Sequence, residues 1–169
     1  MFVVARAITY AAIFIGVLLV FVPAQLLESS GIMRPAETGI LQVAGMVIGG
    51  SGAALALLCV FTFAFVGKGT PAPFDPPRRL VVTGPYAFVR NPMYIGAELV
   101  LLGVVLFYES LSILGFAVVF GLVIISFILL YEEPTLRRMF GPEYEAYTRR
   151  VARWRPRVPP RVGSVRGDK

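Results

Sequence analysis

Long stretches without a charged residue alternate with short polar segments along the chain. Two charge-free runs separate Arg6 from Glu28 and Glu37 from Lys68, and a third covers residues 110–131. Each run exceeds the roughly 18 residues that indicate a helix long enough to cross a membrane. Another apolar run, at residues 92–107, is interrupted only by the charge of Glu98. The pattern therefore predicts four membrane spans, at about residues 7–27, 39–66 and 92–107, with a fourth that ends near residue 131.

Helix breakers divide these spans. Residues 67–85 contain five prolines and several charges, so this loop cannot lie in hydrocarbon as regular structure. Asn91 followed by Pro92 is typical of a helix start. Residues 108–111 predict a tight turn, which would join spans three and four into a helical hairpin.

A stripe of small residues runs along the second span. Gly45, Gly49 and Ala53 recur at four-residue spacing. Small residues on one face let another helix approach closely in a membrane. The stripe therefore indicates helix packing and carries no chemistry.

The C-terminal segment has the pattern of an amphipathic helix. Gly141 and Pro142 interrupt a helix that starts near Pro134, and we expect a second helix to end near residue 153. One apolar and aromatic face, surrounded by arginines, is typical of a helix at a membrane surface. That face consists of Tyr144, Tyr147, Val151 and Trp154. Residues 158–169 are expected to be a disordered tail.

Composition supports a membrane protein. Of the 169 residues, 57% are hydrophobic and 15% are charged, with a mean hydropathy of +0.76. A soluble domain carries about 25% charged residues. We therefore expect an all-α integral membrane protein with four transmembrane helices, a cytosolic Pro-rich loop and an amphipathic C-terminal helix.

The basic residues predict the orientation. Four spans place both termini and the Pro-rich loop on one side, where fifteen of the sixteen Lys and Arg residues lie, and leave only Arg34 on the other. The positive-inside rule then puts both termini in the cytoplasm, in an inner or cytoplasmic membrane. The net charge of +6 accordingly indicates topology and attraction to anionic lipid, and no nucleic-acid partner is expected.

The composition also excludes several kinds of chemistry. The chain has no histidine, so a Ser-His-Asp triad and a His-based zinc protease site are impossible. The single cysteine, Cys59, cannot form an internal disulfide or a metal site made of several thiolates. No metal is expected, and any chemistry must use carboxylates, tyrosines, arginines, backbone groups and a bound cofactor.

Three features at the predicted cytosolic surface could carry that chemistry. Glu98 lies inside the third span, where a carboxylate is costly and indicates a functional site, and it shares a helix face with Tyr94. A structural carboxylate remains the alternative for Glu98. The second feature is the pair of Glu132 and Glu133, which ends the fourth span opposite arginine-rich segments. The third is the rigid string GPYAFVRNPMY at residues 84–94.

These motifs resemble a known family. The string GPYAFVRNPMY is followed after the hairpin by EEPTLRRMFGPEYEAY and preceded by GKGTPAPFDPPRRLVVT. Together they resemble the integral-membrane methyltransferases of the isoprenylcysteine carboxyl methyltransferase and phospholipid methyltransferase group, in the form of a bacterial member. The resemblance covers about residues 67–152. Ile128 stands where family members place an arginine assigned to the substrate, which disfavours a prenylcysteine carboxylate as the acceptor.

The resemblance implies a cofactor, S-adenosylmethionine, and the residues that would contact it. The implied cofactor contacts are Thr70, Pro71, Arg78, Arg79, Leu80, Val81, Tyr86, Asn91, Pro92, Met93, Tyr94 and Glu132. We add Glu98 and Tyr94 as candidates for the meeting point of cofactor and acceptor, and Arg150 as a residue that would close it from the cytosol.

The sequence thus predicts a membrane-embedded S-adenosylmethionine-dependent methyltransferase. Its acceptor would be a lipophilic lipid amine, thiol, carboxylate or hydroxyl, and its partners would include membrane lipids. Residues 1–66 would form two N-terminal transmembrane helices, and residues 67–157 the methyltransferase-like catalytic region. Two alternatives stay open: a non-catalytic membrane module for packing or partner binding, and a sterol-reductase-like enzyme using NADPH, although no dinucleotide fingerprint is present.

Overall fold

The described part of the chain is helical, as the sequence predicts. The structure is a computed structural model, and it describes residues 9, 13, 15–67 and 79–156, among which no strand is present. The α-helices are α2 (Val22–Ser29), α3 (Ile40–Thr62), α4 (Pro92–Tyr108), α5 (Leu111–Phe127) and α6 (Glu133–Arg150). They are extended or joined by the π-helical turns η1 (Ile15–Phe21), η2 (Phe63–Gly67) and η4 (Ile128–Glu132), and η3 (Gly84–Ala87) is a turn of 3-10 helix.

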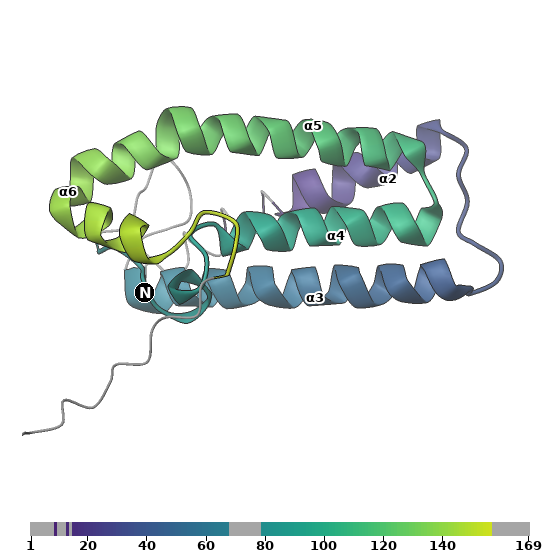
Figure 1. The fold of residues 1–169 in the computed structure, drawn as a ribbon. Helices are drawn as coiled ribbons and strands as arrows, with labels where there is room; N and C mark the ends of the chain where they lie inside the picture. Colours follow the sequence, from purple (N-terminus) through teal and green to yellow (C-terminus); the bar gives the residue numbers. More distant parts are fainter. Residues whose placement is uncertain (1–8, 10–12, 14, 68–78, 157–169) are drawn as a thin grey trace, which may run out of the picture.

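Three long helices lie side by side, with α4 between α3 and α5 (Figure 1). At one end α4 turns into α5, and the loop between α2 and α3 passes nearby; we call this the turn end. At the other end η4 leads into α6, which curves back toward the start of α4; we call this the α6 end. The helices therefore bring the segment before α4, the end of α5 and the whole of α6 to one end of the molecule.

Two of the helices are long and apolar enough to cross a membrane. They are the continuous helices Ile40–Val66, of 27 residues, and Leu111–Arg150, of 40 residues. Gly16–Ser29 and Pro92–Tyr108 are shorter apolar helices; at 1.5 Å per residue the 17 residues of α4 span about 26 Å, slightly less than a hydrocarbon core. Two of the four predicted spans are thus supported by length and composition, and the first and third stay predictions.

Glycines bring α3 and α4 into backbone contact. A Cβ added to Gly52 would lie 2.6 Å from the carbonyl oxygen of Gly96, and one added to Gly103 would lie 2.5 Å from the Cα of Gly49. The predicted stripe is therefore a packing surface at Gly45 and Gly49. Its third member is wrong, because Ala53 is exposed and Gly52 makes the contact. A helix has 3.6 residues per turn, so a strict four-residue repeat drifts off the shared face.

Polar contacts close the turn end. Glu109 adopts the left-handed conformation, with φ of 50°, and the Ser110 hydroxyl caps α5 by accepting a hydrogen bond from the Ile113 amide at 3.3 Å. The Gln42 side chain donates to Oε1 of Glu109 at 3.0 Å and accepts from the Gly39 amide at 3.0 Å. Helices α4 and α5 form the predicted helical hairpin, and Gln42 also connects it to the start of α3.

The C-terminal segment differs from its prediction in what covers its apolar face. The helix bends at Gly141, with φ of 46°, as predicted, and it ends at Arg150 instead of near residue 153. Tyr144, Tyr147 and Val151 are buried in a cluster that also contains Leu80 and Val82. The interpretation of this face as lipid-facing is wrong for these three residues, because the polypeptide before η3 covers them. Trp154 alone of the predicted face is exposed.

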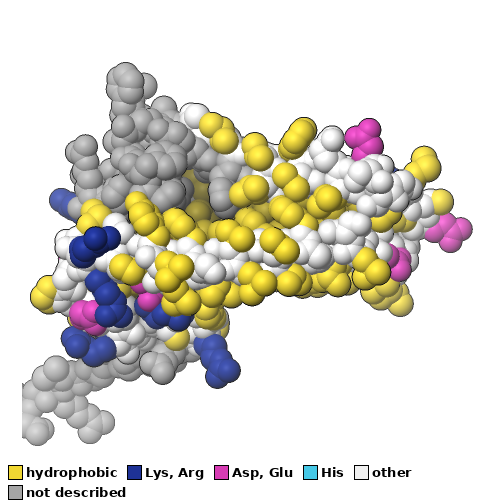
Figure 2. Space-filling model, turned by 90° about the horizontal axis from the view of Figure 1, so that it is seen from above, with side chains coloured by type: hydrophobic (Ala, Val, Ile, Leu, Met, Phe, Trp, Pro, Cys, Tyr) yellow, Lys and Arg dark blue, Asp and Glu magenta, His cyan; other side chains and the backbone are white. Residues whose placement is uncertain are grey.

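Charged side chains separate between the two ends. On the face seen in Figure 2, Lys and Arg side chains gather at the α6 end, and hydrophobic side chains cover the length of the bundle. Among the described residues, eight arginines belong to the segment before α4 or to the part of the chain from α6 onward, whereas Arg34 lies in the loop at the turn end. The α6 end is the basic end of the molecule.

Candidate functional site

The segment before α4 is anchored to three helices. Gly84, the first residue of η3, adopts a left-handed conformation against Thr62, and Pro85 is the second residue of this turn. The Tyr86 ring lies edge-on to Phe63, with the ring centroids 5.2 Å apart, and the carbonyl oxygen of Tyr86 accepts a hydrogen bond from the Tyr147 hydroxyl at 2.7 Å. Burial raises the pKa of Tyr86 well above its usual range. Tyr86 is therefore a fixed, protonated hydrogen-bonding group at the α6 end.

Asn91 occupies the predicted N-cap position of α4 without acting as a cap. Its side chain makes no capping hydrogen bond, and its backbone angles are φ −122° and ψ 50°. The side-chain nitrogen Nδ2 is buried and has no hydrogen-bond partner among the described residues. A buried amide left without a partner costs about 1–3 kcal/mol. Asn91 consequently presents a donor that the fold itself does not use.

Tyr94 and Glu132 connect α4 to η4. The Tyr94 hydroxyl donates a hydrogen bond to Oε2 of Glu132 at 2.8 Å. Glu132 is the last residue of η4, where the π-helical turn changes the direction of the chain into α6. The two predicted residues, 38 positions apart, are thus brought together.

A cavity lies between these groups. It is partly open, and its empty space, with the open solvent at its mouth included, is about 260 Å³. Its lining residues are Phe63, Tyr86, Arg90, Asn91, Met93, Tyr94 and Glu132. Five of the seven are predicted site residues. Phe63 and Arg90 were missed: Arg90 directly precedes the NPMY string and could have been found there, whereas nothing in the apolar run around Phe63 distinguishes it.

An ion-pair cluster lies beside the cavity. Glu133, buried and next to Glu132 in sequence, accepts two hydrogen bonds from Arg153, from Nε at 2.8 Å and from Nη2 at 2.9 Å. Its Oε1 is also 3.0 Å from Nη1 of Arg90. The hydrogen bond with Glu133 raises the pKa of Arg153, which stays charged. The two consecutive glutamates therefore face different surroundings.

None of the other predicted cofactor residues that the structure describes lines the cavity. Pro92 is buried as the first residue of α4, and Val81 packs with Tyr86 and Cys59. Leu80 packs against the C-terminal tyrosines, and Arg79 is exposed. Thr70, Pro71 and Arg78 lie outside the described residues.

Glu98 and Arg150 do not line this cavity. Glu98 is on the next turn of α4 after Tyr94, and a Cβ added to Gly121 of α5 would be 2.8 Å from its Oε1. That oxygen is buried and unpaired among the described residues. Arg150 is exposed, and its Nε donates to the carbonyl oxygen of Ala146 in its own helix. The roles expected of both residues stay predictions.

Comparison with known proteins identifies the family. A model of the phospholipid methyltransferase family matches residues 40–143. The chain belongs to the phospholipid methyltransferase family. All seven residues that line the cavity fall inside the matched region. No curated protein and no solved structure matches the chain. The resemblance noted in the sequence is confirmed at the level of this family of membrane methyltransferases, and the likeness to the isoprenylcysteine branch stays a prediction.

Proposed function

We propose that this member of the phospholipid methyltransferase family transfers a methyl group from S-adenosylmethionine to a lipophilic acceptor at the membrane. The observation that carries the proposal is the polarity of the cavity. Its lining includes Arg90 and Asn91, whose buried donors Nε and Nδ2 have no partner within the described ranges, and Glu132, which carries a carboxylate. Buried polar groups in native proteins are nearly always hydrogen-bonded, so this arrangement supports a polar ligand with both acceptors and donors.

S-adenosylmethionine has the complementary chemistry. It carries a carboxylate, an ammonium group, two ribose hydroxyls and an adenine, and it supplies a methyl group activated by its sulfonium. Asn91 and Arg90 suit an oxygen acceptor, Glu132 suits a hydroxyl or ammonium donor, and the aromatic and thioether surfaces of Tyr86, Phe63 and Met93 suit a flat ring. The residues that line the cavity therefore fit this cofactor.

The proposed methyl transfer does not depend on a strong general acid or base from the protein. Methyl transfer is an in-line displacement that depends on alignment of the two reactants and exclusion of water. Tyr94, held by Glu132, fixes one wall, and the start of α4 fixes another. A mechanism that depends on alignment and not on proton transfer by the protein agrees with a chain that has no histidine.

The acceptor is proposed to reach the cavity from the bilayer. The cavity lies at the α6 end, where the apolar helices α4 and α5 meet the polar segments. A lipophilic molecule could keep its tail beside these helices while its head group meets the methyl group. The proposed site thus takes one reactant from water and the other from the membrane.

Binding of the cofactor tests the proposal directly. Isothermal titration calorimetry in detergent should show that the wild type binds S-adenosylmethionine and its demethylated product. Glu132→Ala should bind about tenfold or more weakly, the loss of about 1.4 kcal/mol expected for one charged hydrogen bond. Glu143→Ala, at an exposed position of α6, is the matched control and should bind like the wild type. Absence of binding by folded wild-type protein would contradict the proposed function.

The orientation is proposed with both termini and the cavity in the cytoplasm. The separation of the arginines between the two ends of the bundle supports it. Reporter fusions after residues 33 and 169 should report opposite sides of an inner or cytoplasmic membrane. Reporters on the same side would mean that the chain crosses the membrane a different number of times.

A further inference from the structure

The guanidinium group of Arg90 is only partly used by the fold. Its Nη1 lies 3.0 Å from Oε1 of Glu133 and donates a hydrogen bond to the Tyr144 hydroxyl at 3.5 Å. Its Nε is buried and has no partner among the described residues, although Arg90 lines the cavity. A buried charged donor without an acceptor is costly. A ligand oxygen atom that accepts a hydrogen bond from this Nε–H would therefore satisfy a donor that the described residues leave unpaired.

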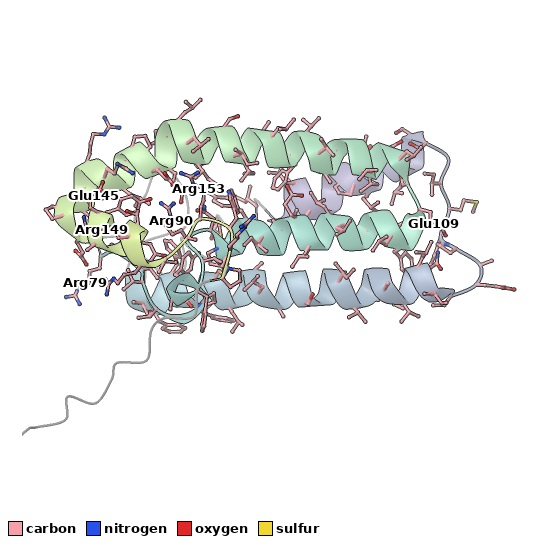
Figure 3. The ribbon with its side chains drawn as sticks, viewed as in Figure 1. Arg79, Arg90, Glu109, Glu145, Arg149 and Arg153 are labelled. Atoms are coloured by element: carbon pink, nitrogen blue, oxygen red, sulfur yellow. The ribbon has the colours of Figure 1, made fainter. Side chains whose placement is uncertain are left out.

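Arg90 is held from two sides. Its backbone amide donates to the carbonyl oxygen of Ala152, just after α6, at 3.0 Å. Its side chain shares the Glu133 carboxylate with Arg153, which makes two hydrogen bonds to Glu133 of 2.8 and 2.9 Å. Figure 3 shows Arg90 and Arg153 close together inside the curve of α6, whereas Arg79 and Arg149 lie at its outer edge. Arg90 is thus fixed in orientation and set apart from Arg79 and Arg149.

A second unused donor follows in the next residue. Nδ2 of Asn91 is also buried and without a partner among the described residues, and Asn91 lines the same cavity. One cationic N–H and one amide N–H, on two consecutive residues that line the same cavity, suit an anionic oxygen pair better than a hydroxyl, because charged hydrogen bonds are about twice as strong as neutral ones. The negatively charged part of the proposed cofactor is its carboxylate.

We propose that Arg90 binds the carboxylate of the amino-acid part of S-adenosylmethionine, with Asn91 as the second donor, and that Glu133 and Arg153 position Arg90 for this contact. The inference rests on the proposed function. It divides the work of the two consecutive glutamates: Glu132 lines the cavity, and Glu133 acts as a positioning residue that connects the segment after α6 to the binding site.

Two ligands that differ only in the amino-acid part test the proposal. S-adenosylhomocysteine carries the carboxylate, and 5′-methylthioadenosine has the same nucleoside and thioether without it. In Arg90→Lys the affinity for S-adenosylhomocysteine should fall about tenfold or more, and that for 5′-methylthioadenosine less than about twofold. The dissociation constant for S-adenosylhomocysteine divided by that for 5′-methylthioadenosine therefore reports on contacts with the amino-acid part, and this ratio should rise in Arg90→Lys. Arg137→Lys, an exposed arginine of α6 paired with Glu145, should leave the ratio unchanged.

Positioning is tested through Glu133 and Arg153. Arg153→Lys keeps the charge but cannot make both hydrogen bonds to Glu133, and it should raise the same ratio about threefold. It also serves if Arg90→Lys does not fold. An equal loss of affinity for both ligands, or an unchanged ratio in Arg90→Lys, would overturn the assignment. Failure of the wild type to bind either ligand would instead overturn the proposed function.

Discussion

The helix α4 is held in different ways along its length. From Gly96 to Gly103 its backbone lies against that of α3 at close range, without side chains between the two helices at the glycines. At its start, Asn91 and the preceding Arg90 are surrounded by carboxylates, hydroxyls and unused donors. The glycine contact is a matter of close packing, whereas the residues at the start of α4 include two buried donors that have no partner among the described residues.

This difference separates the region that holds the bundle from the region that meets a ligand. Backbone contacts at glycines depend on shape alone and are unaffected by charge or bound molecules. Unpaired buried donors reduce stability and persist where a function uses them. Substitutions in the two regions should therefore differ in what they damage, which is the packing of α3 against α4 in one case and the ligand site with the α6 contacts that hold it in the other.

The largest effect is expected where the backbones touch. Gly103→Leu places a side chain where a Cβ alone would be 2.5 Å from Gly49. Neither backbone can move without separating α3 from α4, so we expect a loss of more than about 4 kcal/mol and little folded protein. The melting temperature in detergent measures it. Gly50→Leu, at a position with open space around it, should melt like the wild type, and equal melting of both variants would refute the packing role.

The next largest effect is expected at the ion-pair cluster. Glu133→Ala leaves Arg90 and Arg153 without their shared carboxylate and should cost about 3 kcal/mol, because removal of one partner strands a buried charge. Hydrogen exchange should show α6 losing protection while α3 keeps it. The control is Glu145→Ala, an exposed partner of Arg137, which should cost less than about 0.5 kcal/mol. Uniform loss of protection along the chain would show that the two regions are not separable.

A third substitution tests the zone between the two regions. Glu98 lies one turn after Tyr94, with Oε1 buried and unpaired among the described residues. If it meets the acceptor head group, Glu98→Gln should bind the cofactor like the wild type and transfer methyl groups about tenfold more slowly, a change of about 1.4 kcal/mol in the barrier. Glu37→Gln, in the loop at the turn end, is the control. Unchanged turnover on a true acceptor would assign Glu98 to packing.

The smallest effect is expected where α6 holds the segment before α4. Tyr147→Phe removes the hydrogen bond to the carbonyl oxygen of Tyr86 and should cost about 1 kcal/mol of unfolding free energy. Tyr108→Phe is the comparison, because the Tyr108 hydroxyl makes no hydrogen bond within the described ranges. Thermal unfolding of both variants in detergent measures the difference. A Tyr147→Phe variant that melts with the wild type would show that the tyrosine cluster holds the segment by packing alone.

Much of the architecture could be predicted from local pattern. The hairpin follows from the breaker at residues 108–111, the start of α4 from Asn91 and Pro92, and the bend in α6 from Gly141. These features depend on neighbours in sequence and on backbone preferences, which a sequence displays directly. The two glycine positions at 45 and 49 could be predicted because they share one face of a single helix.

By itself, the sequence determined which stretches are apolar, where helices start and stop, and which motifs carry polar groups. Only the tertiary structure decided which surfaces cover one another. It placed Leu80 and Val82 over the tyrosines of α6, where the sequence pattern predicted lipid. It placed Phe63 in the lining of the cavity, and it paired Glu133 with Arg153 outside that lining. The physical reason is that sequence periodicity reveals only the faces of a single helix. Contacts between distant segments depend on the direction that α6 takes after η4 and after the bend at Gly141.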